Sequence, residues 1–510
     1  MDPFKIPYQE TNKFSDLVVD YVNKSSELDS FISYFPSLHN FKKQIEDKAT
    51  HQIDRETLAS ALENQNAIIS LSDLSKENIR SLRHNNAFTV TTGHQLCLFM
   101  GPLYFIYKII SVINLTEQLN DKFPENRFVP VFWMATEDHD FEEINHINIF
   151  GKKIEWDSKQ SGAVGRMSLS GIDNLLKQLE SILGKSHNAK RLVHLFRDSY
   201  LRNKNLAAAT RYLVNELFGK YGLVIIDGDD KKLKQQFIPI VKKDILESGF
   251  IDVIQESSDA LASSYSKQAF VRDINFFKLS DKNRILITTK EDAAEIDVHP
   301  EYFSPNVLLR PLYQESILPN IATVGGGSEV SYWLQLKTAF QQESIPFPIL
   351  VLRNSVMCIS EKQKQKIRSF DFDLIDIFKD EHYLQNQYVI TKDPSAISLS
   401  KEKTSIKILY SGILTKFNNS GLKDNIKAQL KRQLNALESL ESKLISIEKR
   451  KYKDSVGQIR KLKQQLFPCN SLQERYDSFI PFYLIDGDDF IERLKQNLDP
   501  LDPNFVVLSL

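Results

Sequence analysis

The residues best suited to chemistry form one acidic cluster, Thr136-Glu-Asp-His-Asp-Phe-Glu-Glu143. Such a cluster could bind a divalent cation, recognise amines and hydroxyls, or stabilise the N-terminus of a following helix. Because no His or Cys ligand spacing accompanies it, we expect no metal. Glu142 and Glu143 are assigned to the helix N-terminus. The residues expected to face a ligand stand closest to the preceding apolar run: Glu137, Asp138, His139 and Asp140.

A second polar cluster, Thr91-Thr-Gly-His-Gln95, is followed by Gly101-Pro102. A glycine after a strand lets the backbone approach a ligand, and a helix N-terminus favours anions. His94 could donate to a phosphate or act as an acid or base. The alternative is a tight turn with a hydrogen-bonded histidine. The candidate ligand-binding residues of this stretch are Thr92, Gly93, Gln95, Gly101 and Tyr104.

A third cluster is glycine-rich and opens a helix within Thr323-Val-Gly-Gly-Gly-Ser-Glu-Val-Ser-Tyr-Trp333. Such a turn suits a phosphate or a carboxylate, although it matches neither the dinucleotide-binding fingerprint nor a Walker loop. A surface loop is the alternative. The candidate binding residues here are Gly325, Gly326, Gly327, Ser328, Glu329 and Tyr332. A fourth motif, Leu472-Gln-Glu-Arg475, is interpreted as a helix cap with a surface ion pair.

The elements that must position these clusters include a βαβ unit. The β-branched run 87–92 ends at Gly93, an apolar helix follows from Pro102, and a second strand covers 128–134. Consecutive strands joined by a helix are parallel, and ligands bind at the carboxyl ends of such strands. The first two clusters are therefore expected to share one crevice. Further strands are predicted over 222–227 and 347–352.

The remaining organisation indicates two insertions and a helical tail. From Ser420 to Leu466 leucines recur at spacings of three, four and seven, which predicts a coiled coil of two antiparallel helices. Leu430 to Ile447 present more apolar surface than one partner helix can bury, so a second subunit is expected to cover part of it. The predicted domains are 1–150 (N-terminal helices and first part of the core), 151–204 (first insertion), 205–260 (core), 261–312 (second, strand-rich insertion), 313–375 (core completed), 376–470 (coiled coil) and 471–510 (a segment returning to the core).

Composition narrows the function classes. The 510 residues carry a net charge of −1, so nothing suggests nucleic-acid binding, which normally needs a basic surface. Three scattered cysteines, Cys97, Cys358 and Cys469, fit a reducing cytosol. The N-terminus lacks a signal-peptide pattern. The apolar stretch from Leu96 to Leu115 contains Gly101-Pro102 and Lys108, so we expect a buried helix and no membrane span.

Four segments together resemble the bacillithiol biosynthesis cysteine-adding enzymes. They are TGHQLCLFMGPLYFIYKIIS, PVFWMATEDHDFEEINH, TVGGGSEVSYW and LFPCNSLQER, in that order along most of the chain. The resemblance implies an α/β fold with a Rossmann-like parallel-sheet core, two connective insertions and a C-terminal α-helical coiled coil that forms a homodimer. It also implies a cytoplasmic ligase that adds cysteine to the glucosamine amine of glucosaminyl malate.

If the chain is such a ligase, we expect Asp138 and His139 to orient the attacking amine. We expect His94 to contact phosphate and Gly325–Gly327 to hold nucleotide or malate. The resemblance implies that ATP activates cysteine as an adenylate. Only the Gly-His half of the class I synthetase signature is present, and no basic signature loop follows. The source of activated cysteine therefore stays open between activation by ATP and another activated donor. The alternatives are a nucleotidyltransferase acting on tRNA and a non-catalytic coiled-coil scaffold.

Overall fold

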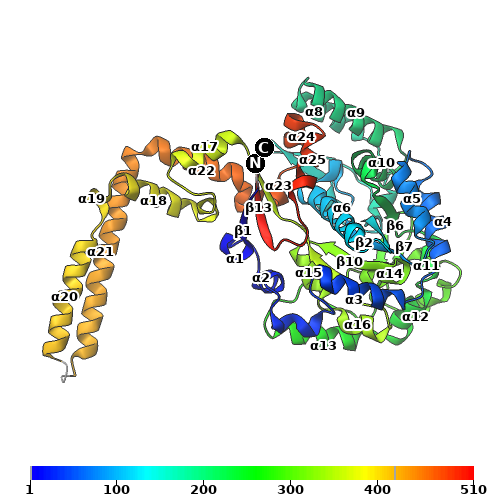
Figure 1. Cartoon of the computed structure of the whole chain (residues 1–510), viewed down its shortest axis with the longest axis horizontal. Helices are drawn as coiled ribbons and strands as arrows, with labels where there is room; N and C mark the ends of the chain where they lie inside the picture. The colour runs from blue at the N-terminus through cyan, green and yellow to red at the C-terminus, as the bar shows by residue number, and fades with distance from the viewer. Residues whose placement is uncertain (1–2, 418–420) are drawn as a thin grey trace. The chain divides into compact units, whose positions relative to one another are not determined.

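The chain forms two compact units in the computed structural model, which describes residues 3–417 and 421–510 (Figure 1). The larger unit contains residues up to Met357 together with Gln473–Val507. The smaller unit contains Cys358–Leu472 and Leu508–Leu510. The segment from 473 to 507 thus belongs to the same unit as the N-terminal half of the chain.

A five-stranded parallel sheet forms the centre of the larger unit, which confirms the predicted fold class. Its order is β11-β10-β2-β3-β6, and every neighbouring pair is parallel. Because helices cover both faces of such a sheet, its strands are almost continuously apolar and buried. The strands are β2 (Ala87–His94), β3 (Arg127–Met134), β6 (Val224–Asp227), β10 (Asn320–Gly325) and β11 (Ile349–Leu352).

The crossover between β2 and β3 is the helix α6 (Tyr104–Lys122), as expected for a βαβ unit. It begins two residues later than Pro102, the predicted first residue. After β6 the chain returns to the opposite side of β2 to add β10. The strand order therefore reverses between β2 and β10, and a reversal of this kind opens a crevice at the carboxyl ends of the strands.

Strand β10 was not predicted, because it reads Asn-Ile-Ala-Thr-Val-Gly and contains two polar residues. Both are buried and hydrogen-bonded inside the unit. The Asn320 side chain accepts from the hydroxyls of Thr89 and Thr91 and donates to Glu315, while Thr323 accepts from Gln314. Tertiary partners thus make a polar sequence acceptable in the middle of a buried sheet.

Helices and two insertions surround this sheet. The first insertion follows β3 and contains a hairpin and three helices. The second follows β6 and ends in a three-stranded antiparallel sheet of order β8-β7-β9. The elements are β4 (His146–Ile149), β5 (Lys152–Glu155), α8 (Ile172–Leu183), α9 (His187–Arg202), α10 (Leu206–Phe218), α11 (Lys231–Gln235), α12 (Ile238–Glu247), α13 (Ile251–Ala262), β7 (Phe276–Leu279), β8 (Arg284–Leu286) and β9 (Phe303–Pro305).

The N-terminal region is helical, as predicted. The C-terminal segment of the larger unit ends within β13 (Asn504–Ser509), whose first four residues pair with β1 (Phe4–Pro7) in antiparallel fashion. Further helices of the larger unit are α2 (Asp16–Val22), α3 (Leu38–Ala49), α4 (Arg55–Asn66), α5 (Asp73–Ser81), α14 (Arg310–Ile317), α15 (Gly327–Trp333), α16 (Lys337–Gln342), α23 (Gln473–Tyr476), α24 (Ile480–Asp486) and α25 (Asp489–Asn497).

The smaller unit is helical, and its main feature is a hairpin of α20 (Ser400–Lys416) and α21 (Lys423–Lys451), which lie side by side (Figure 1). The prediction had placed both long helices between 420 and 466. Instead, that stretch holds α21 and α22 (Lys453–Leu466), with a break at Tyr452, and the partner of α21 precedes it. The sequence of α20 has no regular leucine spacing, so it gave no coiled-coil signal. Ser420, the first residue of the predicted stretch, lies outside the described residues.

Candidate active site

A cavity of about 510 Å³ lies at the carboxyl ends of β2 and β3, beside the start of α15. This is the crevice that the reversal of strand order creates. The structure therefore brings the first three predicted clusters together. The predicted residues that line the cavity are Gly93, His94, Gln95, Tyr104, Glu137, Asp138, Ser328, Glu329 and Tyr332.

One wall of the cavity is acidic, and the side chain of Gln95 organises it. The Gln95 amide nitrogen donates to Asp138 Oδ2 and to Glu143 Oε2, both at 2.7 Å. The other oxygen of Asp138 accepts from the backbone N–H of His139 at 2.7 Å. The Gln95 amide thus holds the carboxylates of Asp138 and Glu143 side by side. Their remaining lone pairs are available to a ligand.

The position of Glu143 corrects the prediction that it merely stabilises a helix N-terminus. The helix in question, α7 (Phe141–Ile144), is a single turn. A helix this short has almost no macrodipole, and its one turn directs Glu143 towards Gln95 in the cavity lining. Glu142, the neighbouring carboxylate, is exposed and does not line the cavity.

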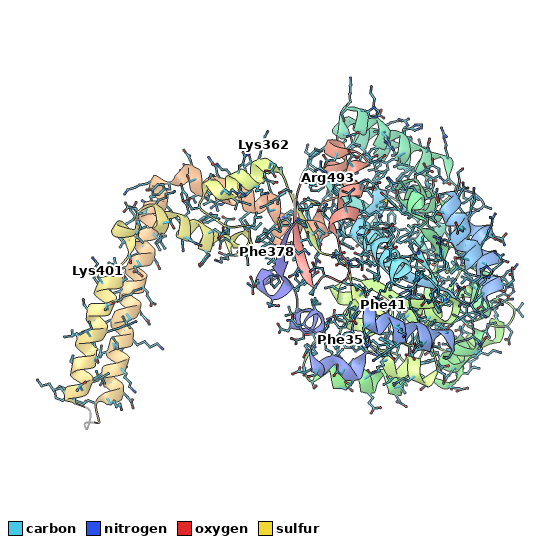
Figure 2. All side chains as sticks on the ribbon, in the orientation of Figure 1. Phe35, Phe41, Lys362, Phe378, Lys401 and Arg493 are labelled. Carbon is cyan, nitrogen blue, oxygen red and sulfur yellow. The ribbon has the colours of Figure 1, made fainter. Side chains whose placement is uncertain are left out.

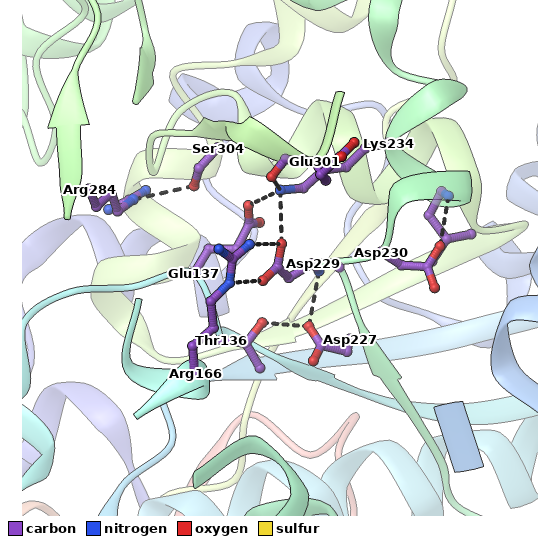
Figure 3. Close-up of polar contacts among 12 residues, drawn as sticks. Thr136, Glu137, Arg166, Asp227, Asp229, Asp230, Lys234, Arg284, Glu301 and Ser304 are labelled. Atoms are coloured by element: carbon purple, nitrogen blue, oxygen red, sulfur yellow. Dashed lines mark hydrogen bonds and ion pairs between the residues drawn. The ribbon is translucent and has the colours of Figure 1, made fainter. Parts of the chain in front are cut away.

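Behind the acidic wall lies a network of buried charges (Figure 3). The Lys234 ammonium donates to Glu137 at 2.5 Å and to Asp229 at 3.2 Å. Arg166 forms two hydrogen bonds with Asp229, at 2.8 and 3.0 Å. Burial alone would lower the pKa of Lys234, but Glu137 and Asp229 outweigh it and raise this pKa overall. The Lys234 ammonium therefore holds the Glu137 side chain in place.

Asp227 stands at the end of β6 in the same network, where it accepts a 2.5 Å hydrogen bond from the Thr136 hydroxyl. Burial and the nearby charge of Asp229 raise the pKa of Asp227 to about 6. The sequence showed Asp227 and Asp229 only as polar residues after a strand. Their role in fixing Glu137 depends on Lys234, which comes from the next helix, α11.

A second buried ion pair joins the floor of the cavity to the glycine-rich turn. The Lys108 ammonium lies 2.5 Å from Glu329 Oε2 and donates to the Gly93 carbonyl at 2.8 Å. The same Glu329 oxygen accepts from the Gly326 N–H at 2.8 Å. Burial would raise the pKa of Glu329, but the ammonium and this N–H outweigh it and lower that pKa.

His94 is buried and neutral. Its Nδ1 lies 2.9 Å from the Gln95 carbonyl, which can only accept, so Nδ1 carries the proton and Nε2 keeps a lone pair. Burial, with the nearby positive charge of Lys108, lowers the pKa of His94 to about 3. The imidazole can accept a proton or a hydrogen bond, but it offers no positive charge to a phosphate.

Several predicted site residues lie outside the cavity lining. Thr92 donates its hydroxyl to the Val324 carbonyl at 2.8 Å, which ties β2 to β10. Gly101 has a φ of +53°, and a side chain there would meet Cys97. His139 is about half exposed, with Nδ1 3.2 Å from Arg284 Nη1, and Asp140 is exposed.

The glycine turn also lies outside the cavity lining, because the protein itself fills it. A Cβ on Gly325 would come within 3.0 Å of the Glu329 side chain, and one on Gly327 within 2.8 Å of Val18. The Gly326 N–H is already bonded to Glu329. An acidic side chain therefore occupies the place where a phosphate would have to bind.

Leu472, Gln473 and Glu474 of the fourth motif are buried, contrary to the predicted surface ion pair, and Arg475 is exposed. Glu474 accepts from Arg353 Nη2 at 2.7 Å and from the Val356 N–H at 2.9 Å, and its side chain is fully buried. The Arg353 guanidinium lies 5.1 Å from the centre of the Tyr104 ring, which lines the cavity. The motif thus supports the cavity wall from behind. Its short polar sequence carried no sign of burial.

Other lining residues were not predicted. Lys108 stood out in the sequence as a lysine in an apolar helix, a signal that could have identified it. Trp133, Met134 and Ala135 belong to the predicted strand 128–134 and the turn after it. The others come from segments with no distinctive pattern: Arg284, Pro305, Asn306, Val307 and Arg310. Pro305 ends β9, and Asn306 and Val307 follow it, so the second insertion forms part of the cavity wall.

Within the described residues, no group of His, Cys, Asp and Glu has the arrangement of a metal site. None of the described helices is long and apolar enough to cross a membrane. The fold is that of a Rossmann-like α/β protein, and a cavity lined by several charged side chains lies at the point where the strand order reverses.

The chain belongs to the bacillithiol biosynthesis BshC family. The model of the family's N-terminal Rossmann-like domain matches residues 1–354, and that of its C-terminal coiled-coil domain matches 356–510. A Flavobacterium johnsoniae protein named "Putative cysteine ligase BshC" is 43% identical, with 99% of each chain covered. Relatives with the same name are 42% identical in Flavobacterium psychrophilum, over 99% of each chain, and 35% identical in Cytophaga hutchinsonii, over 97% of each.

Proposed function

We propose that this protein is the ligase that joins cysteine to the glucosamine amine of glucosaminyl malate, the last step of bacillithiol biosynthesis. Membership of the family and the names of the relatives support a cysteine-adding role. The observation that carries the specific reaction is the acidic wall, where one amide holds Asp138 and Glu143 beside Glu137. Carboxylates in this arrangement suit an amino sugar, which offers an amine and several hydroxyls.

The proposed chemistry is acyl transfer to nitrogen. The lone pair of the neutral amine attacks the carbonyl carbon of an activated cysteine, a C–N bond forms, and the bond from that carbon to its leaving group breaks. The nitrogen must lose one proton. Asp138 accepts that proton in our proposal, because it lines the cavity and hydrogen bonds from Gln95 and the His139 N–H hold it in position.

His94 provides a second acceptor in the cavity lining. Its Nε2 lone pair suits a hydrogen bond from a substrate hydroxyl or amine, since the imidazole stays neutral at physiological pH. We therefore assign His94 to substrate recognition in place of the predicted phosphate contact. Because Glu329 fills the glycine turn, these residues do not fit a nucleotide phosphate there. No step of the proposed reaction depends on a nucleotide at that turn.

We further propose that the protein works in the cytoplasm as a homodimer formed through the hairpin of α20 and α21. Leu430, Leu434 and Leu437 are only partly buried within one chain. Ile408 and Leu409 of α20 are more than half exposed, at 69% and 61%. A second copy of the same hairpin would cover these side chains.

The reaction is tested in cells and with purified protein. Deleting the gene should abolish bacillithiol while glucosaminyl malate accumulates, as measured by mass spectrometry of thiol-labelled extracts. Normal bacillithiol in the deletion strain would refute the assignment, and altered tRNA charging would favour the nucleotidyltransferase. The purified protein, supplied with a cell extract as the source of activated cysteine, should restore the thiol product in the deletion extract.

A further inference from the structure

The positive charges in and around the cavity fall into two groups. Four of them are paired with buried or half-buried carboxylates: Lys108 with Glu329, Lys234 with Glu137 and Asp229, Arg166 with Asp229, and Arg353 with Glu474. Arg284 and Arg310 line the cavity without such a partner. No carboxylate of the described residues lies within 4.0 Å of either guanidinium.

Both arginines are nevertheless held in position. Arg284 donates to the Pro305 carbonyl at 2.9 Å and to the Ser304 hydroxyl at 3.3 Å, and it stacks on Phe277 at 4.1 Å. It is only partly exposed, and burial lowers its pKa. A guanidinium that is withdrawn from water and fixed by neutral groups keeps donors free for an anion.

Arg310 also lines the cavity and is fixed by neutral groups. Its Nη1 donates to Gln314 at 2.9 Å, and its guanidinium lies 5.9 Å from the Trp133 ring centre. Its Nη2 lies 3.5 Å from the Tyr332 hydroxyl. A planar guanidinium with unused N–H groups binds carboxylates by two parallel hydrogen bonds, so this geometry also selects an anion.

We propose that Arg284 and Arg310 form a carboxylate-binding subsite that holds the malyl group of the acceptor substrate. This inference rests on the proposed function. The carboxyl group of cysteine is the one that reacts, so it carries no free carboxylate when it is activated. The malyl group keeps two carboxylates throughout, one for each arginine. The cavity then matches its substrate by charge, with the amine at the acidic wall and the carboxylates at the arginines.

The test is calorimetric binding to the full-length protein, with glucosaminyl malate and with methyl glucosaminide, which lacks the carboxylates. Arg310→Gln and Arg284→Gln should each weaken glucosaminyl malate binding at least about tenfold, because each removes a charge from a partly desolvated pair. Binding of methyl glucosaminide should stay unchanged. Arg272→Gln removes an exposed arginine of the same insertion and should change neither ligand.

The outcomes separate this subsite from the reaction itself. If both arginine variants bind glucosaminyl malate like wild type, the subsite is refuted even where the thiol product still forms. If they lose affinity for activated cysteine instead, the arginines serve the donor and the malyl assignment fails. If arginine-dependent binding is found but wild type forms no thiol product, the subsite stands and the proposed reaction fails. Thermal midpoints check that each variant is folded, and the two variants test the subsite independently.

Discussion

Helix α6 of the larger unit buries nearly every side chain from Phe105 to Thr116, including the ammonium of Lys108. Helix α20 of the smaller unit buries none of its side chains, although it carries isoleucines and leucines. Figure 2 shows the same contrast: side chains fill the interior of the larger unit, while those of the hairpin project outward along its length. A buried charge is unfavourable unless another group of the protein pairs with it. Exposed apolar side chains that form a continuous surface indicate that another molecule covers them.

The partners differ between the two regions. In the larger unit the cations around the cavity are paired with carboxylates of the same chain, except Arg284 and Arg310, which line the cavity. In the smaller unit the unburied groups are apolar and repeat along a helix. We therefore expect the larger unit to bind a charged small molecule and the smaller unit to bind another copy of itself.

The largest effect is expected from breaking a buried ion pair of the larger unit. Glu474→Gln leaves Arg353 without its charged partner and weakens the contact to the Val356 N–H. Removing one member of a buried pair destabilises a fold by about 3–5 kcal/mol. Urea denaturation of the larger unit, followed by tryptophan fluorescence, measures this loss.

The matched control is Glu56→Gln, which breaks an exposed ion pair with Arg83 in the same unit. Water already solvates that pair, so little change is expected. Equal stabilities of the Glu474 and Glu56 variants would show that the buried pair contributes no more than a surface one.

The next largest effect concerns turnover. Asp138→Asn should lower the rate of thiol product formation roughly a hundredfold, because an amide cannot accept the amine proton. The thermal midpoint should stay near that of wild type, since Gln95 can still hydrogen-bond the new side chain. Glu142→Gln is the control, because Glu142 lies on the same turn as Glu143 but does not line the cavity. Full activity in Asp138→Asn would remove this carboxylate from the reaction and direct attention to Glu143.

A smaller effect is expected in the hairpin. Leu440 is 47% exposed in the single chain, so Leu440→Ser should weaken the dimer about tenfold or more while leaving the fold intact. Analytical ultracentrifugation measures the dimer dissociation constant. Replacing Leu434 and Leu437 together should shift the protein further towards monomer. Ile285→Ser, at an exposed position of the larger unit, should have no effect. A wild-type monomer at micromolar concentration would refute the dimer.

The smallest effect is a change in pH dependence. Burial lowers the pKa of His94 from its usual value near 6.5 to about 3, so between these values the unfolded chain binds a proton that the folded chain does not. The free energy of unfolding should therefore fall as the pH drops from 6.5 towards 3. His94→Gln should make this fall shallower, as measured by urea denaturation at pH 7 and pH 4.5. The control His84→Gln, at an exposed histidine, should leave this pH dependence unchanged. If His94→Gln also leaves it unchanged, His94 is charged in the folded protein at the lower pH.

The sequence alone determined the architecture of the core. β-Branched runs ending in polar clusters, with an apolar helix between them, predicted two parallel strands with a shared crevice, because hydrophobic periodicity is a local property. The sequence also identified Asp138, Gln95 and His94 as candidate site residues, since each lies at or just after the carboxyl end of a predicted strand.

Only the tertiary structure decided which charges are paired. The role of Glu143 depends on Gln95, 48 residues away, and that of Glu474 on Arg353, 121 residues away. Strand β10 is stable because Thr89, Thr91 and Glu315 satisfy its polar side chains. Arg284 and Arg310 differ from the paired cations only by their neighbours. Burial and ion pairing belong to residues that meet in space, and for this reason no local pattern in the sequence could reveal them.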